Sequence, residues 1–343
     1  MKIGLVGYQG SGKSTLFQWL TGIAADPAIA HQSQSAMAMI PDARMEALQQ
    51  IYNPKKVTHA SLEMVDTPGL DRRHEGNAAR LAQIREAGCL VMVVGAYQSD
   101  SDPLTDLKRF DEDLLLADFQ IVTGRIERLR EALKKPRPDR AQQQAELESL
   151  EPILDCLEEG RRIQRLNLSE QQIHATRSFQ LLTQKPRLVV LNAADDQTDL
   201  AGAAAEIPGE VPRVAIPVGL ELELAQLEAT ERDEFIKEMG ITLTDRAGLI
   251  RILVDVSDQL LFFTAGEKEV RSWLLPKRST ALEAAGNIHT DIARGFIRSE
   301  TMKSEDLIRL GSERKMKAQN LVRSEPKDYV IQAGDILLFR FNV

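Results

Sequence analysis

The sequence predicts an α/β protein: a parallel sheet covered by helices, with an inserted α-helical coiled-coil hairpin and a small C-terminal α+β domain. Three observations lead to this prediction. Short apolar runs alternate with helical patterns up to residue 94 and again after residue 186, which is typical of a parallel sheet with helices on both faces. Between these parts lies a long charged segment whose apolar residues recur at steps of three and four. After residue 258, strand-like runs surround one helical pattern.

The chain begins with the pattern of a strand, a loop and a helix. Residues 2–6 (KIGLV) suit a buried strand, and residues 15–20 (TLFQWL) open a helical pattern. Between them, GYQGSGKST at residues 7–15 contains the complete spacing G-x-x-x-x-G-K-[ST]. Glycines let consecutive amides turn toward one anion, and the positive end of the following helix points to the same place. We therefore predict a P-loop nucleotide-binding sheet, rather than a glycine-rich turn without a ligand.

Two residues of this loop have distinct predicted roles. Lys13 would reach the β and γ phosphates and act in catalysis, and Ser14 would offer its hydroxyl to Mg2+. The loop residues predicted to contact the nucleotide are Gly7, Gln9, Gly10, Ser11, Gly12, Lys13, Ser14 and Thr15.

The following segments continue the alternation. Residues 22–40 are rich in Ala, Gln and Ser and are predicted to be mobile, and residues 62–65 (LEMV) form a second buried strand. A helical pattern covers residues 78–87, and residues 89–94 (CLVMVV) form a third strand.

The second strand ends in DTPG at residues 66–69, where nucleotide hydrolases place D-x-x-G. Asp66 would hold Mg2+, and the Gly69 amide would sense the γ-phosphate. In Ras-like enzymes the next residue is a glutamine that orients the attacking water, a role that Leu70 cannot take. His74 is the remaining catalytic candidate, although a histidine in a loop more often faces solvent.

Residues 104–182 are predicted to form an antiparallel helical hairpin inserted in the sheet domain. Two prolines break the helical pattern at residues 134–139. The apolar stripe that would join the two helices contains Leu129, Leu133, Leu147, Leu150, Ile153, Leu154 and Leu157. Basic residues gather toward the tip, where a solvated face is favoured over a binding surface. These residues are Arg125, Arg128, Arg130, Lys134, Lys135, Arg137 and Arg140.

Strand character resumes at residues 187–191 (RLVVL), directly before Asn192 and Asp195. Guanine-specific proteins carry N-K-x-D at this place, and here Ala193 replaces the lysine whose stem packs on the base. Because ligands lie at the carboxyl ends of parallel strands, Asn192 and Asp195 are predicted to contact the nucleotide. The remaining predicted nucleotide contacts are Gly219 and Leu220.

The rest of the chain predicts a change of architecture. After a strand at residues 213–217, helices are predicted at residues 220–239 and 243–257. The runs LLFFT, VRSWLL, GFIRS, DYVI and DILLFRF then surround one helix near residues 280–288, as in a small α+β module. The predicted domains are residues 1–103 with 183–258 for nucleotide binding, 104–182 for the hairpin and 259–343 for the C-terminal module.

Composition limits the class of protein. The chain has 343 residues, 43% of them hydrophobic, and a formal net charge of -8, so the overall charge indicates no DNA specificity. The two cysteines, Cys89 and Cys156, provide neither a disulfide framework nor a metal-ligand set. The sequence shows no signal-peptide pattern and no apolar run of membrane length, from which we expect a cytoplasmic protein with no membrane partner.

Motifs spread over nearly the whole chain point to one family. In order, they are GYQGSGKSTLF, DTPGL, LNLSEQQIHATRSFQLLTQKP and ERDEFIKEMG. They are followed by FFTAGEKEVRSWLLP, AAGNIHTDIARGFIRSE and KDYVIQAGDILLFRFNV, which are similar to the TGS module, a small β-grasp domain. Together these stretches resemble the Obg-like ATPases of the YchF type.

The resemblance implies a nucleotide hydrolase that prefers ATP in many members, associates with ribosomes and is linked to translation and stress. The family's fourth motif reads N-x-x-E, and the loss of N-K-x-D accounts for the use of ATP. Here Asp195 stands in place of that glutamate. This shorter carboxylate shifts the balance slightly back toward guanine, so the resemblance favours ATP as the substrate while GTP stays open.

Departures from the family pattern indicate a divergent member. QGS stands where the P-loop of the family reads P-N-V. Residues 22–40 contain no threonine to meet Mg2+, and Ser33 and Ser35 are the nearest substitutes. Residues 95–110 contain no histidine, whereas the family is thought to use one there in hydrolysis.

Two functions remain open from the sequence. The leading one is a switch that binds and hydrolyses Mg-ATP or Mg-GTP, with a ribosome or RNA as partner. The alternative is a non-catalytic adaptor that binds nucleotide and docks on RNA or protein through a basic stripe at residues 314–323. A metabolic kinase is disfavoured because nothing specifies a small-molecule acceptor.

Overall fold

The computed structural model describes residues 1–98, 101–136, 138–207, 209, 211–239 and 244–342. By its internal contacts the chain divides into two units, which are Met1–Ala36 with Glu63–Asp245 and Met37–Leu62 with Arg246–Val343. Residues 37–62 and 246–258, which the sequence placed in the nucleotide-binding domain, group by these contacts with the C-terminal strands. The predicted hairpin lies within the first unit.

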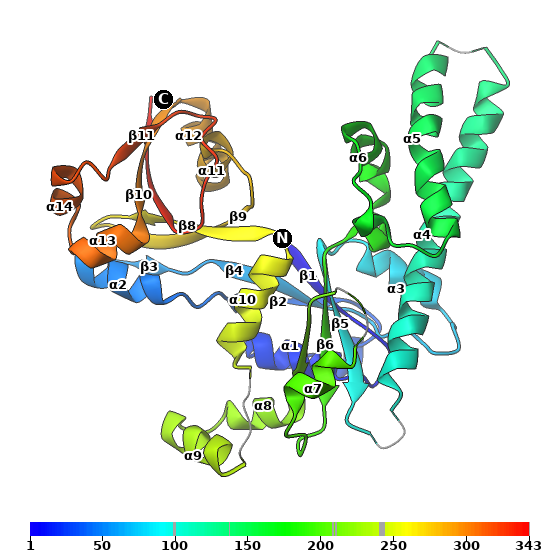
Figure 1. Cartoon of the computed structure of the whole chain (residues 1–343), viewed down its shortest axis with the longest axis horizontal. Coiled ribbons are helices and arrows are strands. Elements are labelled where there is room, and N and C mark those ends of the chain that lie inside the picture. The colour runs from blue at the N-terminus through cyan, green and yellow to red at the C-terminus, as the bar shows by residue number, and fades with distance from the viewer. Residues whose placement is uncertain (99–100, 137, 208, 210, 240–243, 343) are drawn as a thin grey trace. The chain divides into compact units, whose positions relative to one another are not determined.

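A six-stranded sheet forms the centre of the first unit, although the end of β2 and the start of β4 belong to the residues grouped with the second unit (Figure 1). Its strands are β1 (Lys2–Val6), β2 (Gln34–Met39), β4 (Ser61–Asp66), β5 (Cys89–Ala96), β6 (Arg187–Ala193) and β7 (Arg213–Ile216). Their order in space is β2-β4-β1-β5-β6-β7, and the pairs from β4 to β7 are parallel. Because parallel strands point the same way, the segments after β1, β4 and β6 meet at one edge of the sheet. The predicted parallel sheet is confirmed.

Helices connect and flank these strands. They are α1 (Lys13–Thr21), α3 (Asn77–Ile84), α6 (Glu170–Thr176), α7 (Leu200–Ala205), α8 (Val218–Leu224) and α9 (Ala229–Met239). Short 3-10 turns are η1 (Pro27–Ile29), η2 (Ile163–Arg165), η3 (Arg177–Phe179) and η4 (Leu182–Gln184).

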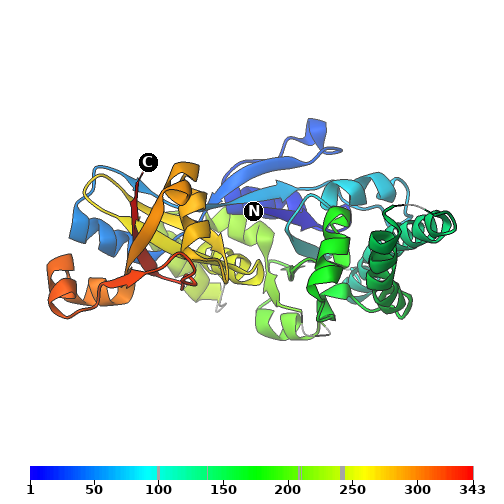
Figure 2. The same cartoon turned by 90° about the horizontal axis from the view of Figure 1, so that it is seen from above.

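The inserted hairpin consists of α4 (Pro103–Leu133) and α5 (Arg140–Glu158), which lie side by side in both views (Figures 1 and 2). Asp102 caps α4 by accepting a hydrogen bond from the Thr105 amide. The two helices share an apolar core, which confirms the predicted packing of their stripes. Residues of the predicted stripe in this core are Leu129, Leu147, Leu150, Ile153 and Leu157, and Leu133 and Leu154 pack at its margin.

Two basic residues of the hairpin are paired with carboxylates of the facing helix. Arg125 Nε lies 2.7 Å from Glu146 Oε1, and Arg130 Nη2 lies 2.9 Å from Glu151 Oε1. Arg137, which the sequence placed in the same group, lies outside the described residues. The pairing supports a solvated face of matched charges.

The second unit is built on a mixed sheet whose order is β11-β10-β12-β8-β9-β3. Its strands are β3 (Val57–Thr58), β8 (Gln259–Ala265), β9 (Val270–Pro276), β10 (Phe296–Lys303), β11 (Arg323–Glu325) and β12 (Asp335–Phe341). Its helices are α2 (Ala43–Tyr52), α10 (Arg246–Val256), α11 (Ala281–Ile288), α12 (Thr290–Arg294), α13 (Ser304–Leu310) and α14 (Glu313–Ala318). The predicted α+β character is confirmed, with several helices where the sequence indicated one.

Other segments differ from the sequence-based expectation. Residues 22–40, predicted to be mobile, contain η1 and β2, and residues 328–331 form no strand, since Val330 makes only an isolated bridge to Thr280. In β2 the buried Ala38 alternates with the exposed Met37 and Met39, so the usual pattern of apolar residues inside and polar residues outside is absent.

In the described part of the chain, no helix is both long and apolar enough to span a bilayer.

Candidate functional site

Glycines give the loop after β1 a backbone that other residues rarely adopt. The φ angles are 146° at Gly7, 76° at Gly10 and 94° at Gly12. A Cβ on Gly7 would lie 2.4 Å from the carbonyl oxygen of Val93 in β5. Helix α1 starts directly afterwards at Lys13, so its free amides face the same region. The loop therefore has the curvature that an anion cradle requires.

Lys13 is almost completely buried at the start of α1. Its side chain is 6% exposed, and Nζ donates a hydrogen bond to the Tyr8 carbonyl at 2.8 Å. Burial lowers the pKa of Lys13 to about 8, although the nearby Asp66 carboxylate acts in the opposite direction. The Lys13 ammonium has only a neutral carbonyl as its hydrogen-bond acceptor here, so an anionic oxygen would bind it more strongly.

Ser14 and Asp66 meet across the same site. Ser14 Oγ donates to Asp66 Oδ2 at 2.6 Å, while Asp66 Oδ1 is buried without a hydrogen-bond partner among the described residues. Burial raises the pKa of Asp66, and the contacts with Ser14 and Lys13 partly offset this effect. A hydroxyl and an unpartnered carboxylate oxygen are the hard oxygen ligands that suit Mg2+.

A cavity of about 500 Å³ opens beside these residues, a volume in the range of small-molecule sites. Among the predicted site residues, those that line it are Gln9, Gly10, Lys13, Ser14, Asp66 and Gly69. Gly7 and Gly12 instead pack against β5 and β6, while Ser11 accepts a hydrogen bond from Asn192 and Thr15 lies in the first turn of α1.

The DTPG turn is joined to the loop. A Cβ on Gly69 would lie 2.8 Å from Lys13 Nζ and 2.9 Å from the Gln9 nitrogen. The Leu70 amide donates to the Gly7 carbonyl, and the Gln9 amide donates to the Leu70 carbonyl, each at 3.0 Å. Only glycine fits at position 69, where its backbone reaches the phosphate-binding loop.

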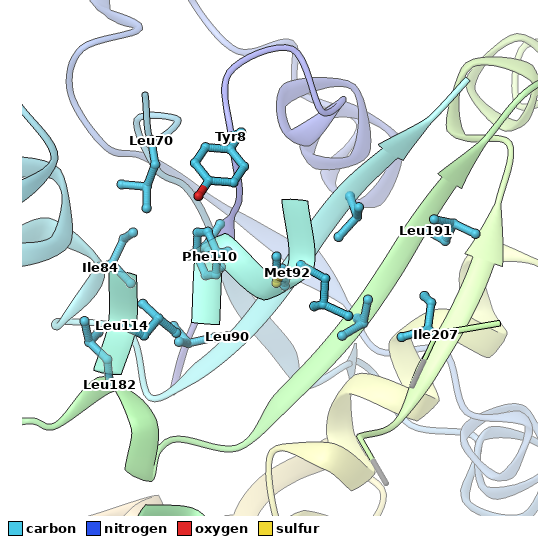
Figure 3. Close-up of a cluster of buried hydrophobic side chains, with 14 of the residues drawn as sticks. Tyr8, Leu70, Ile84, Leu90, Met92, Phe110, Leu114, Leu182, Leu191 and Ile207 are labelled. Atoms are coloured by element: carbon cyan, nitrogen blue, oxygen red, sulfur yellow. The ribbon is translucent and has the colours of Figure 1, made fainter. Parts of the chain in front are cut away.

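Leu70 itself faces the protein interior. Its side chain is fully buried in a cluster with Tyr8 and Phe110 (Figure 3). Leu70 therefore does not reach the cavity, in agreement with the prediction that it cannot orient water.

His74 does not join the other catalytic candidates. Its backbone has φ 65°, its Nδ1 lies 2.9 Å from Asp113 Oδ1 on α4, and its side chain is 63% exposed. The residues that line the cavity include Lys13 and Gly69 but not His74. Its position gives no support to a catalytic role.

The residues predicted at the base end form a linked group. Asn192 Nδ2 donates to the Ser11 carbonyl, and its Oδ1 accepts from the Val218 amide, both at 3.1 Å. Asp195 is exposed, and its Oδ1 accepts from the Leu220 amide at 3.1 Å. A Cβ on Gly219 would lie 3.3 Å from the same oxygen. Asn192 thus connects the loop with the start of α8. Asp195 lies beside Gly219 and Leu220 of α8.

Sequence reasoning missed several residues of the cavity wall. They are Ala25, Asp26, His31, Gln32, Gln34 and Arg80. Ser33 and Ser35, the expected Mg2+ substitutes, line a separate cavity, where Ser33 Oγ donates to Gln83 Oε1 at 2.9 Å. Residues 22–40 are rich in Ala, Gln and Ser, and this composition does not indicate which side chains face the cavity. For Arg80 the only signal was a basic residue early in the helix that follows DTPG.

Comparisons with known proteins agree with this geometry. Residues 2–123 match a family model described as 50S ribosome-binding GTPase, and residues 260–342 match the YchF-GTPase_C model, described as a protein of unknown function (DUF933). The chain is 34% identical to the ribosome-binding ATPase YchF of Haemophilus influenzae, over 100% of this chain and 99% of that protein. It is 33% identical to the protein of the same name from Bacillus subtilis, over 99% of each. The solved YchF GTPase of Schizosaccharomyces pombe superposes with a TM-score of 0.86 at 26% identity, over 99% of this chain and 97% of that one.

Proposed function

The chain belongs to the YchF family, and from this premise we propose that it is a nucleotide hydrolase that acts as a switch on the ribosome. Its relatives along the full length are named ribosome-binding ATPases, which supports ATP as the substrate and the ribosome as the partner. The observation that carries the proposal is the buried Lys13 beside the Ser14 and Asp66 pair, all on one cavity. Because ribosomes are its expected partner, we place the protein in the cytoplasm.

The roles of the phosphate-binding residues follow from this arrangement. Backbone amides of residues 7–15 would hold the phosphates, and Lys13 would exchange the Tyr8 carbonyl for the β and γ phosphates. Ser14 and Asp66 would hold Mg2+, which neutralises phosphate charge when it is bound. The Gly69 amide would sense the γ-phosphate, and hydrolysis would remove this contact between the phosphate and the DTPG turn.

Base recognition is assigned to the group around Asp195. The Asp195 carboxylate lies near Gly219 and Leu220, and Ala193 leaves no lysine stem to pack on a guanine. Without that packing surface we propose ATP as the preferred nucleotide and GTP as the second.

A nucleotide-dependent adaptor is the second candidate. The burial of Leu70 and the pairing of His74 with Asp113 leave the two positions considered for water orientation outside the cavity. Hydrolysis without a stimulating partner is therefore expected to be slow.

Titration calorimetry with ATP and GTP in Mg2+, followed by phosphate release with and without ribosomes, tests the proposal. We expect tighter binding of ATP and release that ribosomes stimulate. Lys13→Ala should abolish binding, whereas Lys108→Ala, at an 80% exposed side chain on α4, should leave it unchanged. Nucleotide binding without phosphate release, both with and without ribosomes, would favour the adaptor. A failure to bind either nucleotide would overturn both functions.

A further inference from the structure

Arg80 forms part of the wall of the proposed nucleotide cavity. It lies in the first turns of α3, is partly buried and lines the same cavity as Lys13, Ser14 and Gly69. It comes from the element that directly follows the DTPG turn. Its positive charge therefore faces the cavity that would hold a triphosphate, although no sequence motif marks it.

Hydrogen bonds attach Arg80 to the loop after DTPG. Its Nη1 donates to the Glu75 carbonyl at 3.2 Å and to Asn77 Oδ1 at 3.3 Å. Asn77 is buried, its Oδ1 also accepts from the Asp71 amide at 2.8 Å, and its Nδ2 donates to the Asp71 carbonyl at 3.0 Å. The described residues provide no recorded acceptor for Arg80 Nε or Nη2. The guanidinium is thus held at one nitrogen and has donors left for a ligand.

The charges of the cavity wall favour a role for Arg80 as a second cation beside Lys13. Among the described lining residues, Lys13 and Arg80 are the fixed positive charges, and Asp26 and Asp66 are the negative ones. Asp26 caps η1 by accepting from the Ala28 amide, and Asp66 accepts from Ser14. A triphosphate adds several negative charges, and charge on the γ-phosphoryl oxygens needs stabilisation during its transfer. A guanidinium with free donors matches phosphate oxygens in shape and charge.

We propose that Arg80 is a catalytic residue that contacts the γ-phosphate of the bound nucleoside triphosphate. In the reaction, the oxygen of water bonds to the γ phosphorus while the bond from phosphorus to the β–γ bridging oxygen breaks. The bridging oxygen keeps the electron pair and leaves with the nucleoside diphosphate, and the protons of water pass to inorganic phosphate and solvent. Arg80 stabilises the charge on the γ oxygens throughout, as an arginine supplied from within the same chain. This inference rests on the proposed nucleotide hydrolase.

Variants at this position separate catalysis from structure. Arg80→Gln should lower single-turnover hydrolysis at least about 100-fold. It should weaken binding of a non-hydrolysable ATP analogue about tenfold while leaving ADP affinity unchanged, because ADP has no γ-phosphate. Arg80→Lys keeps the charge without the forked donors and should give an intermediate rate. The matched control is Arg73→Gln, at an exposed arginine of the segment between DTPG and α3 that does not line the cavity.

The outcomes distinguish this inference from the proposed function. A wild-type rate for Arg80→Gln, or equal weakening of the ATP analogue and ADP, would overturn the role of Arg80 while the hydrolase stands. If the wild-type protein hydrolyses ATP too slowly to measure, the binding data still test the role of Arg80. The ratio of ATP-analogue affinity to ADP affinity should then fall in Arg80→Gln and, to a smaller extent, in Arg80→Lys. Absence of nucleotide binding in the wild type would instead overturn the proposed function, and the role of Arg80 with it.

Discussion

Gly12 and Asn192 fit together without room for a side chain, since a Cβ on Gly12 would lie 2.2 Å from Asn192 Nδ2. That nitrogen donates to the Ser11 carbonyl, and the amide oxygen of the same side chain accepts from Val218. A single asparagine thereby connects the phosphate-binding loop with the start of α8. The glycine is required both by its φ of 94° and by this contact.

Gly12→Ala should therefore damage both stability and binding. We expect the free energy of unfolding to fall by about 2 to 3 kcal/mol, because the new methyl group strains the backbone and displaces Asn192. ATP binding should be lost. Denaturant unfolding and calorimetry measure the two effects. Gly124→Ala is the matched control: it lies within α4 in open space, so it should raise stability by about 0.5 to 1 kcal/mol. Unchanged stability of Gly12→Ala would contradict the close contact.

The buried Lys13 predicts proton uptake on nucleotide binding at alkaline pH. Its pKa of about 8 in the free protein should rise when phosphates replace the Tyr8 carbonyl as its partner. Well below pH 8 the lysine is protonated in both states, so binding takes up no proton at this group. Above pH 8 the free lysine loses its proton and must regain it, so affinity should fall by up to about tenfold per pH unit. Calorimetry at pH 9 in two buffers of different ionisation enthalpy counts the protons, and zero uptake would show that Lys13 remains charged in the free protein.

Leu70→Gln should not restore fast hydrolysis. The side chain at this position is completely buried with Tyr8 and Phe110, so a glutamine would place an amide in an apolar core. We expect a loss of about 3 kcal/mol in unfolding free energy and no increase in phosphate release. Leu70→Met, a change that nearly conserves volume, should cost less than about 1.5 kcal/mol. A faster and fully stable Leu70→Gln protein would mean that this side chain can turn to the cavity.

Asp195→Ala should alter the choice of base more than the affinity for phosphate. Its carboxylate is exposed beside Gly219 and Leu220 and is not among the residues that line the cavity around Lys13. We expect the ratio of ATP to GTP affinity to change, while binding of inorganic tripolyphosphate stays the same. Competition titrations measure both, with the exposed neighbour Asp196→Ala as the control. An unaltered ratio would remove Asp195 from the base site.

The sequence was sufficient where the structure depends on local pattern. β1, β5 and β6 are nearly continuous apolar runs, and the P-loop spacing indicated Lys13 and Ser14, both of which line the cavity. β2 was missed because its inward residues, Gln34, Ala36 and Ala38, are polar or small and its outward ones include two methionines, so the usual contrast is absent.

Long-range contacts account for what the sequence could not reveal. Whether Arg80 reaches the cavity depends on where α3 begins and on the bond to Asn77, neither of which is encoded in a motif. The grouping of residues 37–62 with the second unit likewise depends on partners far along the chain. One of these contacts is the pairing of Val57 with Val270.

That pairing joins positions about 210 residues apart, which has a consequence for the order of events during synthesis. At a translation rate of roughly 5 to 20 residues per second, β3 waits about 10 to 40 s for β9 to be made. Met45 and Leu48 of α2 wait longer still, because the apolar cluster that contains them also includes Ile336. The N-terminal part of the nascent chain, at α2 and β3, therefore lacks its apolar partners until the last part is made. Truncated products should be prone to aggregation even when their nucleotide-binding strands are complete.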